Sequence, residues 1–334
     1  MTQPPELAVA MDWGGTWTRA AVIARDGEIL WQSRFSSPKK ASRARLLESA
    51  EGLLREALGW CANRPVAGVG IAVAGPVDAE TGTLHDPPNL PELDGVSLKD
   101  LWEPILGRPV WVGNDANLAA LGEFHCGAGR EPSADGTPTR ILVYLTVSTG
   151  IGGGVVDRGK MFLGANGLAA EIGHMAIDPR DAAPLCQCGN RGCLESLASG
   201  TAIGLAARAC QAEPGSASSV LAGGAAGSID AQSVFRAASQ GDGLALDILE
   251  VAVQALSVGL ANTLHLFNPD LLVLGGGVTV GLTGLDLLPR IQSLINQRAM
   301  SERHKDFRLA ASRLGDSAGL VGAATLVWQQ VSAA

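Results

Sequence analysis

Three apolar segments that end in glycine turns constrain the fold of this chain most strongly. The turns lie at residues 12–16, 148–154 and 275–279, and each one contains threonine or aspartate. Glycine lets a backbone approach a ligand closely, and backbone N–H groups with nearby hydroxyls can bind phosphate oxygens. A single Gly-Gly turn is more often only a tight turn. Three such turns in one chain predict a site for a nucleotide.

The segment around the first turn resembles the segment around the second. Residues 9–23 and 143–156 both have the pattern of an apolar strand, a Gly/Thr turn and a return strand. The chain has 334 residues, which exceeds what one hydrophobic core usually supports. The sequence therefore predicts two lobes that begin with related segments.

Charge and composition exclude several classes of protein. The chain has 25 Lys and Arg against 33 Asp and Glu, and no basic cluster offers the electrostatic footprint of nucleic-acid binding. The apolar pattern at residues 244–267 is interrupted by polar side chains and predicts a core helix, and the first residues lack the pattern of an export signal. We therefore expect a cytoplasmic protein that binds neither nucleic acid nor a membrane.

Two familiar nucleotide-binding patterns do not fit. Residues 154–160 match G-x-x-x-x-G-K, but Met161 replaces the Ser or Thr that would reach magnesium, and the segment has the pattern of a β-hairpin. No glycine set matches G-x-G-x-x-G between a strand and a helix. We therefore reject a P-loop and disfavour a nicotinamide dehydrogenase.

A group of cysteines lies in a glycine-rich segment, and a histidine precedes it by twelve residues. Three thiolates and one imidazole would complete a closed, tetrahedral zinc shell of the structural type, whereas free thiols are the alternative. A filled shell would organise the chain rather than activate water. The candidate ligands are His174, Cys186, Cys188 and Cys193.

Zinc at this position would fix the turn that carries two glutamates, Glu171 and Glu195. A ligating imidazole has a second ring nitrogen that can meet another partner, so His174 could also contact a ligand.

The dipeptide Asn114-Asp115 lies where a predicted strand ends and a predicted helix, residues 115–126, begins. An aspartate at such a point is most often a plain N-cap. The functional alternative is a general base that orients an acceptor hydroxyl and takes its proton as the hydroxyl attacks phosphorus.

The combined order of these motifs resembles the ROK family of sugar kinases and sugar-responsive repressors, within the actin-like ATPase superfamily. The resemblance covers essentially the whole chain. Its motifs are Met11-Asp12-Trp13-Gly14-Gly15-Thr16, Gly75-Pro76-Val77-Asp78, Gly113-Asn114-Asp115-Ala116-Asn117, Ser148-Thr149-Gly150-Ile151-Gly152-Gly153-Gly154, Glu171-Ile172-Gly173-His174, the cysteine knuckle that ends in Cys193-Leu194-Glu195, and Leu274-Gly275-Gly276-Gly277.

The resemblance implies an actin-like ATPase (ribonuclease H-like) α/β fold, with two lobes around a cleft and a structural zinc knuckle. Residues 1–113 and a closing helix at 317–334 would form the small lobe. Residues 114–316 would form the large lobe and contain the zinc knuckle.

The resemblance also assigns roles to individual residues. Asp115 corresponds to the catalytic base. The sugar hydroxyls would be bound by Asn114, Glu171, His174 and Glu195, with Gly75 and Asn89 lining the sugar side. Asp12, Gly14, Gly15 and Thr16 would face the phosphates, with Asp12 helping to hold Mg2+, and Thr149, Gly150, Gly275 and Gly276 would approach the nucleotide. His174, Cys186, Cys188 and Cys193 would hold structural Zn2+.

Two positions near the phosphate turn need separate comment. Trp13 stands where an aliphatic residue is commoner in the family, so we expect different packing beneath the turn. Arg19 either begins a strand, which is the commoner role for a residue placed there, or contacts the nucleotide.

These residues predict an ATP-dependent hexose kinase, with conversion of glucose to glucose 6-phosphate as the favoured reaction. The alternatives within the family are kinases for N-acetylmannosamine, N-acetylglucosamine or fructose. A non-catalytic sugar sensor or transcriptional regulator is disfavoured, because Asp115 is present and only eleven residues precede Asp12, where the family's repressors carry a DNA-binding module. We also expect a homo-oligomer, a dimer or a tetramer. The sequence leaves open the sugar and a phosphate donor other than ATP.

Overall fold

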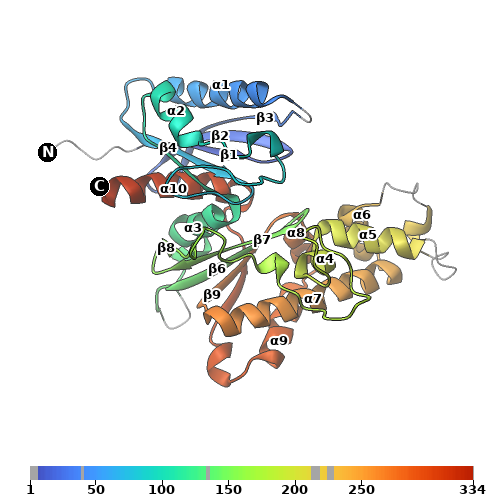
Figure 1. Cartoon of the computed structure of the whole chain (residues 1–334). Coiled ribbons are helices and arrows are strands. Elements are labelled where there is room, and N and C mark those ends of the chain that lie inside the picture. Colours follow the sequence, from blue (N-terminus) through green and yellow to red (C-terminus); the bar gives the residue numbers. More distant parts are fainter. Residues whose placement is uncertain (1–6, 39–40, 133–135, 212–218, 224–228, 334) are drawn as a thin grey trace. The chain divides into compact units, whose positions relative to one another are not determined.

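In a computed structural model of the chain, the N-terminal strands form a five-stranded sheet in the order β3-β2-β1-β4-β5 (Figure 1). β2 runs antiparallel to β1 and to β3, whereas β4 runs parallel to β1 and to β5. β4 is buried along its whole length, which accounts for its continuous apolar sequence. The strands are β1 (Leu7–Trp13), β2 (Trp17–Ala24), β3 (Ile29–Ser36), β4 (Val66–Val73) and β5 (Val110–Asn114). The structure describes residues 7–38, 41–132, 136–211, 219–223 and 229–333.

Helices pack on this sheet. The hydroxyl of Ser42 caps α1 by accepting a hydrogen bond from the N–H of Arg45, and the buried residues of α1 recur at helical spacing. The residue that follows α2, Gly107, has a φ of 61°, a left-handed conformation that suits glycine. The helices and short 3-10 turns are α1 (Arg43–Cys61), η1 (Pro91–Leu93), α2 (Leu98–Leu106), α3 (Asp115–Cys126), η2 (Ala128–Arg130), η7 (Gly315–Ser317) and α10 (Ala318–Ala333).

The second five-stranded sheet has the order β10-β9-β6-β7-β8. β9 runs parallel to both β6 and β10, and β7 runs antiparallel to β8. Its strands are β6 (Ile141–Val147), β7 (Ile151–Asp157), β8 (Lys160–Met161), β9 (Leu271–Gly275) and β10 (Arg308–Ala311). The accompanying helices are η3 (Ile172–His174), α4 (Leu194–Ala198), α5 (Gly200–Gln211), η5 (Val220–Gly223), α6 (Ala231–Ser239), α7 (Gly243–Phe267), α8 (Gly277–Gly284), α9 (Leu288–Arg298) and η6 (Glu302–Lys305).

The chain divides into two compact units. Unit 1 comprises Met1–Thr139, Gly154–Ala169 and Arg313–Ala334, and unit 2 comprises Arg140–Gly153 and Ala170–Ser312. The predicted lobes, 1–113 with 317–334 and 114–316, stay a prediction, and the bounds of the units differ from them.

Close packing of α3 on α10 places residues 115–126 in unit 1. The helices approach so closely that a Cβ added at Gly322 would overlap the backbone of Leu118, and one added at Gly122 would lie 2.6 Å from the carbonyl oxygen of Ala318. Glycine at these two positions therefore permits the contact.

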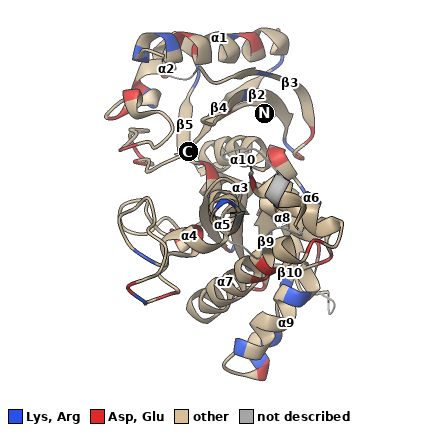
Figure 2. Ribbon diagram, turned by 90° about the vertical axis from the view of Figure 1, so that its right-hand side faces the viewer, with Lys and Arg blue, Asp and Glu red and all other residues tan. Residues whose placement is uncertain are grey.

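Among the described residues, α7 is long and apolar enough to cross a membrane, by length and composition only, and 61% of its most apolar window is buried inside the structure. That burial is typical of the core helix that the sequence predicts there. Basic and acidic residues are interspersed on α1 in unit 1 and around α9 in unit 2 (Figure 2).

Candidate active site

Asp115 is the first residue of α3 and follows β5 directly. Asn114 occupies the N-cap: its Oδ1 accepts hydrogen bonds from the N–H groups of Ala116 and Asn117 at 3.0 and 3.1 Å. The Oδ1 of Asp115 accepts from the N–H of Ala116 at 2.8 Å. Burial nevertheless raises the pKa of Asp115 above its ordinary value. The capping role thus belongs to Asn114, and Asp115 is a half-buried carboxylate beside it.

Asn114 also connects α3 to the end of β4. Its side-chain amide donates a hydrogen bond to the carbonyl oxygen of Gly75 at 3.2 Å. Gly75 has a φ of 114°, and a Cβ added there would lie 3.0 Å from both Pro87 and Pro88. Only glycine fits this position without strain. The structure therefore brings the predicted residues Gly75, Asn114 and Asp115 together at the ends of adjacent strands.

The phosphate turn, defined as residues 14–16, connects β1 to β2. The N–H of Gly14 donates to the carbonyl oxygen of Trp17 at 3.0 Å, which closes the hairpin. The side chain of Asn89 lies against Gly15, where an added Cβ would be 2.8 Å from its Cγ. Asn89, which we expect to line the sugar, therefore also lies next to the predicted phosphate turn.

Asp12 lies two residues before this turn and pairs across the sheet with Arg19. Burial, and then the nearby Asp115, raise the pKa of Asp12 to about 7, although the positive charge of Arg19 acts in the opposite direction. The Nη1 of Arg19 lies 3.9 Å from the Oδ2 of Asp12 and donates to the carbonyl oxygen of Asp316 at 2.9 Å. Arg19 is therefore a strand residue, and its guanidinium also faces Asp12.

Trp13 packs inward beneath the phosphate turn. Its ring stacks on that of Trp102 in α2, with a centroid separation of 5.7 Å and an interplanar angle of 24°, and both side chains are buried. The bulky residue that departs from the family pattern is thus accommodated by a second tryptophan.

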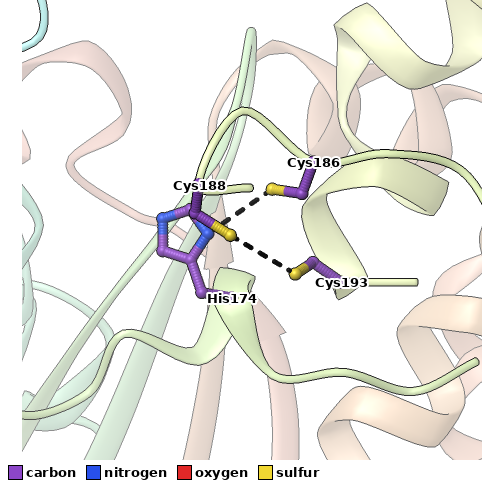
Figure 3. A group of neighbouring side chains, drawn as sticks. All are labelled: His174, Cys186, Cys188 and Cys193. Atoms are coloured by element: carbon purple, nitrogen blue, oxygen red, sulfur yellow. Dashed lines mark hydrogen bonds between the residues drawn. The ribbon is translucent and has the colours of Figure 1, made fainter. Parts of the chain in front are cut away.

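In unit 2, the four predicted zinc ligands converge (Figure 3). Their ligand atoms all lie within 4.8 Å of one another. The Sγ of Cys186 is 3.6 Å from the Nδ1 of His174, and the Sγ atoms of Cys188 and Cys193 are 3.7 Å apart. Zn–S bonds of about 2.3 Å in a tetrahedron place ligand atoms about 3.7 Å apart, so this donor set fits zinc.

Glycines and backbone hydrogen bonds shape the knuckle, residues 186–193. The N–H of Cys186 donates to the carbonyl oxygen of Asn190 at 2.8 Å, and Gly189 has a φ of 91°. Gly192 also has a positive φ, and a Cβ there would overlap the carbonyl of Asp178. The N–H of Asn190 lowers the pKa of Cys188 to about 7. Burial raises the pKa of Cys186 and of Cys193.

His174 presents its two ring nitrogens to different partners. Its Nδ1 faces the cysteines, whereas its Nε2 lies 4.0 Å from the Oε2 of Glu171, the residue that precedes η3. The geometry therefore allows one imidazole to hold a metal through Nδ1 and still contact a polar partner through Nε2.

Glu195 lies in the first turn of α4, two residues after the candidate ligand Cys193, which is the N-cap of that helix. Its Oε2 accepts a hydrogen bond from the N–H of Ile151 at 2.8 Å, and its Oε1 lies 3.7 Å from the Sγ of Cys186. Glu195 therefore contacts both Ile151 and the knuckle residue Cys186.

The two glycine turns of unit 2 follow adjacent parallel strands, β6 and β9. The carbonyl oxygen of Thr149 accepts from the hydroxyl of Thr201 at 2.8 Å, and that of Gly150 accepts from the N–H of Ser148 at 2.9 Å. Gly276 has a φ of 86° and is the N-cap of α8, and Gly275 leaves space for the hydroxyl of Tyr144. The predicted nucleotide residues of unit 2 thus lie at the carboxyl ends of two adjacent strands of the second sheet.

Sequence reasoning missed two buried polar residues of unit 1. The carboxylate of Glu123 accepts from the N–H groups of Ala128 and Leu314 at 2.8 and 2.9 Å. Ser37 contacts the phosphate turn through a hydrogen bond from its hydroxyl to the carbonyl oxygen of Gly14 at 2.6 Å. The sequence signal for Glu123 was a glutamate within an otherwise apolar helical segment. No sequence pattern indicates the role of Ser37.

These two sheets and their helices form an α/β fold of the actin-like ATPase type. The fold matches the crystal structure of a ROK family glucokinase from Streptomyces griseus in complex with glucose and AMPPNP, with a TM-score of 0.79 and 32% sequence identity over 97% of this chain and 99% of that chain. The predicted fold class is therefore confirmed.

The ROK family model matches residues 8–330, and the chain belongs to the ROK family. It is 34% identical over 333 residues to a glucokinase of Thermotoga maritima, covering 98% of this chain and 99% of that one. It is also 31% identical to a putative xylose repressor of a Caldicellulosiruptor species, covering 96% of this chain and 78% of the repressor. The predicted resemblance to a glucokinase-like member of the family is confirmed.

Proposed function

We propose that this protein is an ATP-dependent sugar kinase that converts glucose and ATP to glucose 6-phosphate and ADP. The family and the similarity to proteins named glucokinase support sugar phosphorylation. The observation that carries the proposal is the position of Asp115: a half-buried carboxylate at the start of α3, with a raised pKa, whose neighbour Asn114 already provides the helix cap.

Asp115 acts as the general base in the proposed reaction. The primary hydroxyl of the sugar attacks the γ-phosphorus of ATP, its proton passes to the carboxylate of Asp115, and the bond to the β,γ-bridging oxygen breaks to release ADP. A raised pKa brings this carboxylate nearer to the pH at which a base is most effective. Asn114, Glu171, His174 and Glu195 are the residues that we propose hydrogen-bond the sugar hydroxyls.

The glycine turns bind the nucleotide. Gly14, Gly15 and Thr16 are proposed to offer N–H groups and a hydroxyl to the phosphates. Thr149, Gly150, Gly275 and Gly276 are proposed as further nucleotide contacts. The carboxylate of Asp12 is suited to help hold Mg2+, which would neutralise phosphate charge.

Zinc has a structural role in this proposal. His174, Cys186, Cys188 and Cys193 would supply all four ligands of a structural zinc ion, which would leave no position for a reacting water. The site holds the backbone on which Glu171 and Glu195 stand. We further propose that the enzyme is a cytoplasmic homo-oligomer.

Three alternatives remain testable. The residues that bind hydroxyls would also suit N-acetylmannosamine, N-acetylglucosamine or fructose, because none of them identifies the substituent at C2. Another phosphate donor could replace ATP. Sugar sensing without catalysis is the third alternative, and the similarity to a protein named as a putative xylose repressor supports it.

The deciding experiment measures ADP release from ATP over a panel of hexoses and N-acetylhexosamines, with DNA binding as a parallel assay. We expect turnover with glucose and no DNA binding. ADP release with an N-acetylhexosamine in place of glucose would change the substrate, and sugar binding without turnover on any sugar would replace the kinase with a sensor.

A further inference from the structure

A buried pair of hydroxyls underlies the phosphate turn in unit 1. Ser37, directly after β3, donates a hydrogen bond from its hydroxyl to the carbonyl oxygen of Gly14 at 2.6 Å, and its N–H donates to the carbonyl oxygen of Thr16 at 2.9 Å. The same hydroxyl lies 3.0 Å from that of Thr18, which is fully buried. Ser37 itself is 8% exposed. One serine thus holds the carbonyls at both ends of the turn.

The direction of these hydrogen bonds follows from counting protons. A serine hydroxyl has one proton, and that of Ser37 is given to Gly14. The hydroxyl of Thr18 must therefore donate to Ser37 rather than accept from it. The hydroxyl of Ser37 therefore accepts one hydrogen bond and donates another, and the two together hold it in one orientation. A serine hydroxyl on the surface would rotate freely.

Holding the carbonyl of Gly14 also sets the direction of the next N–H group. In a trans peptide the N–H of one residue points opposite to the carbonyl of the residue before it, and the described residues contain no cis peptide. The N–H of Gly15 therefore points away from Ser37. Within the described part of the chain, that N–H has no hydrogen-bond partner.

We propose that Ser37, supported by Thr18, is a positioning residue that aims the N–H of Gly15 at the phosphates of ATP. This inference rests on the proposed function, because it assumes that the turn binds phosphate. Ser37 acts through the backbone of the turn and does not itself touch the nucleotide. Nothing in the sequence pattern of the turn indicates this role, since Ser37 lies more than twenty residues beyond Gly14.

The test compares Ser37→Ala with Ser36→Ala, a matched control at the neighbouring exposed serine. Calorimetry measures the affinity for AMPPNP with magnesium and, separately, for glucose. We expect Ser37→Ala to weaken AMPPNP binding about 3- to 10-fold, the value of one hydrogen bond, and to leave glucose binding unchanged. Ser37→Thr keeps the hydroxyl and should restore the affinity for AMPPNP.

Thr18→Val covers the case in which Ser37→Ala does not fold. Valine matches the shape of threonine but cannot donate to Ser37, so AMPPNP binding should weaken about 2- to 5-fold. Unchanged AMPPNP affinity in these variants would overturn the proposal. An equal loss of AMPPNP and glucose affinity, together with a lower Tm, would also overturn it, because it would indicate a general loss of structure.

The readouts keep this inference separate from the proposed function. If the wild-type protein phosphorylates no sugar, the kinase proposal fails, but AMPPNP binding still decides the role of Ser37. If the wild type is an active kinase and Ser37→Ala binds AMPPNP normally, only the positioning role fails.

Discussion

The carboxylate of Glu195 accepts a hydrogen bond from the backbone N–H of Ile151 at 2.8 Å. Ile151 follows the Thr149-Gly150 turn directly, and Glu195 stands two residues after the candidate zinc ligand Cys193. Within unit 2, a residue proposed to bind the sugar is therefore tied to the turn proposed to bind the nucleotide.

Replacing Glu195 with glutamine should weaken sugar binding. Glutamine keeps an oxygen that can accept from the N–H of Ile151, but it loses the charge that strengthens hydrogen bonds to sugar hydroxyls. We expect the KM for glucose to rise about 10- to 100-fold, the usual value of a hydrogen bond to a charged group. Steady-state kinetics checks this, with the exposed Glu302→Gln as control. A KM equal to that of the wild type would remove Glu195 from the sugar site.

Cys188→Ser should lower zinc content and sugar affinity together, because bound zinc would hold the backbone that carries Glu171 and Glu195. Loss of an outer or structural support for a site typically costs about 10- to 100-fold in affinity. Elemental analysis and glucose titration measure the two quantities. Cys210→Ser, outside the cluster, should change neither. A metal-free Cys188→Ser variant with normal glucose affinity would refute the scaffolding role.

The activity should depend on the ionisation of Asp115. A general base must be deprotonated, and burial raises the pKa of Asp115 above the ordinary value of 3.8. Activity is therefore present at high pH and is lost as the pH falls through the raised pKa. The acidic limb of the profile of kcat/KM for the sugar measures this pKa. A limb near pH 4, or one that persists in Asp115→Asn, would contradict the assignment.

Parts of the fold were predictable because local signals agreed with tertiary packing. The helix expected at residues 115–126 is present with those bounds, since an asparagine cap and an apolar stretch both specify it. The cysteine cluster converges as expected, because four ligand-type residues in a short, glycine-rich segment have few other arrangements.

Other features depend on contacts between segments distant in sequence. α2 was not expected, although Ser97 caps it and Trp102 stacks on Trp13 beneath the phosphate turn. The stacking of Trp13 on Trp102 and the hydrogen bond from Ser37 to Gly14 join residues more than twenty positions apart, and no local pattern specifies either partner. The unit bounds likewise depend on the glycine contacts between α3 and α10.

Glucose-dependent ADP release by the wild type and by Asp115→Asn tests the central claim most directly. Asparagine has the same shape and can still accept from the N–H of Ala116, so the fold and glucose binding should persist. Because general-base assistance is typically worth about 10²- to 10⁴-fold, we predict a loss of turnover of that size with glucose affinity retained. Turnover by Asp115→Asn at the wild-type rate would contradict the account.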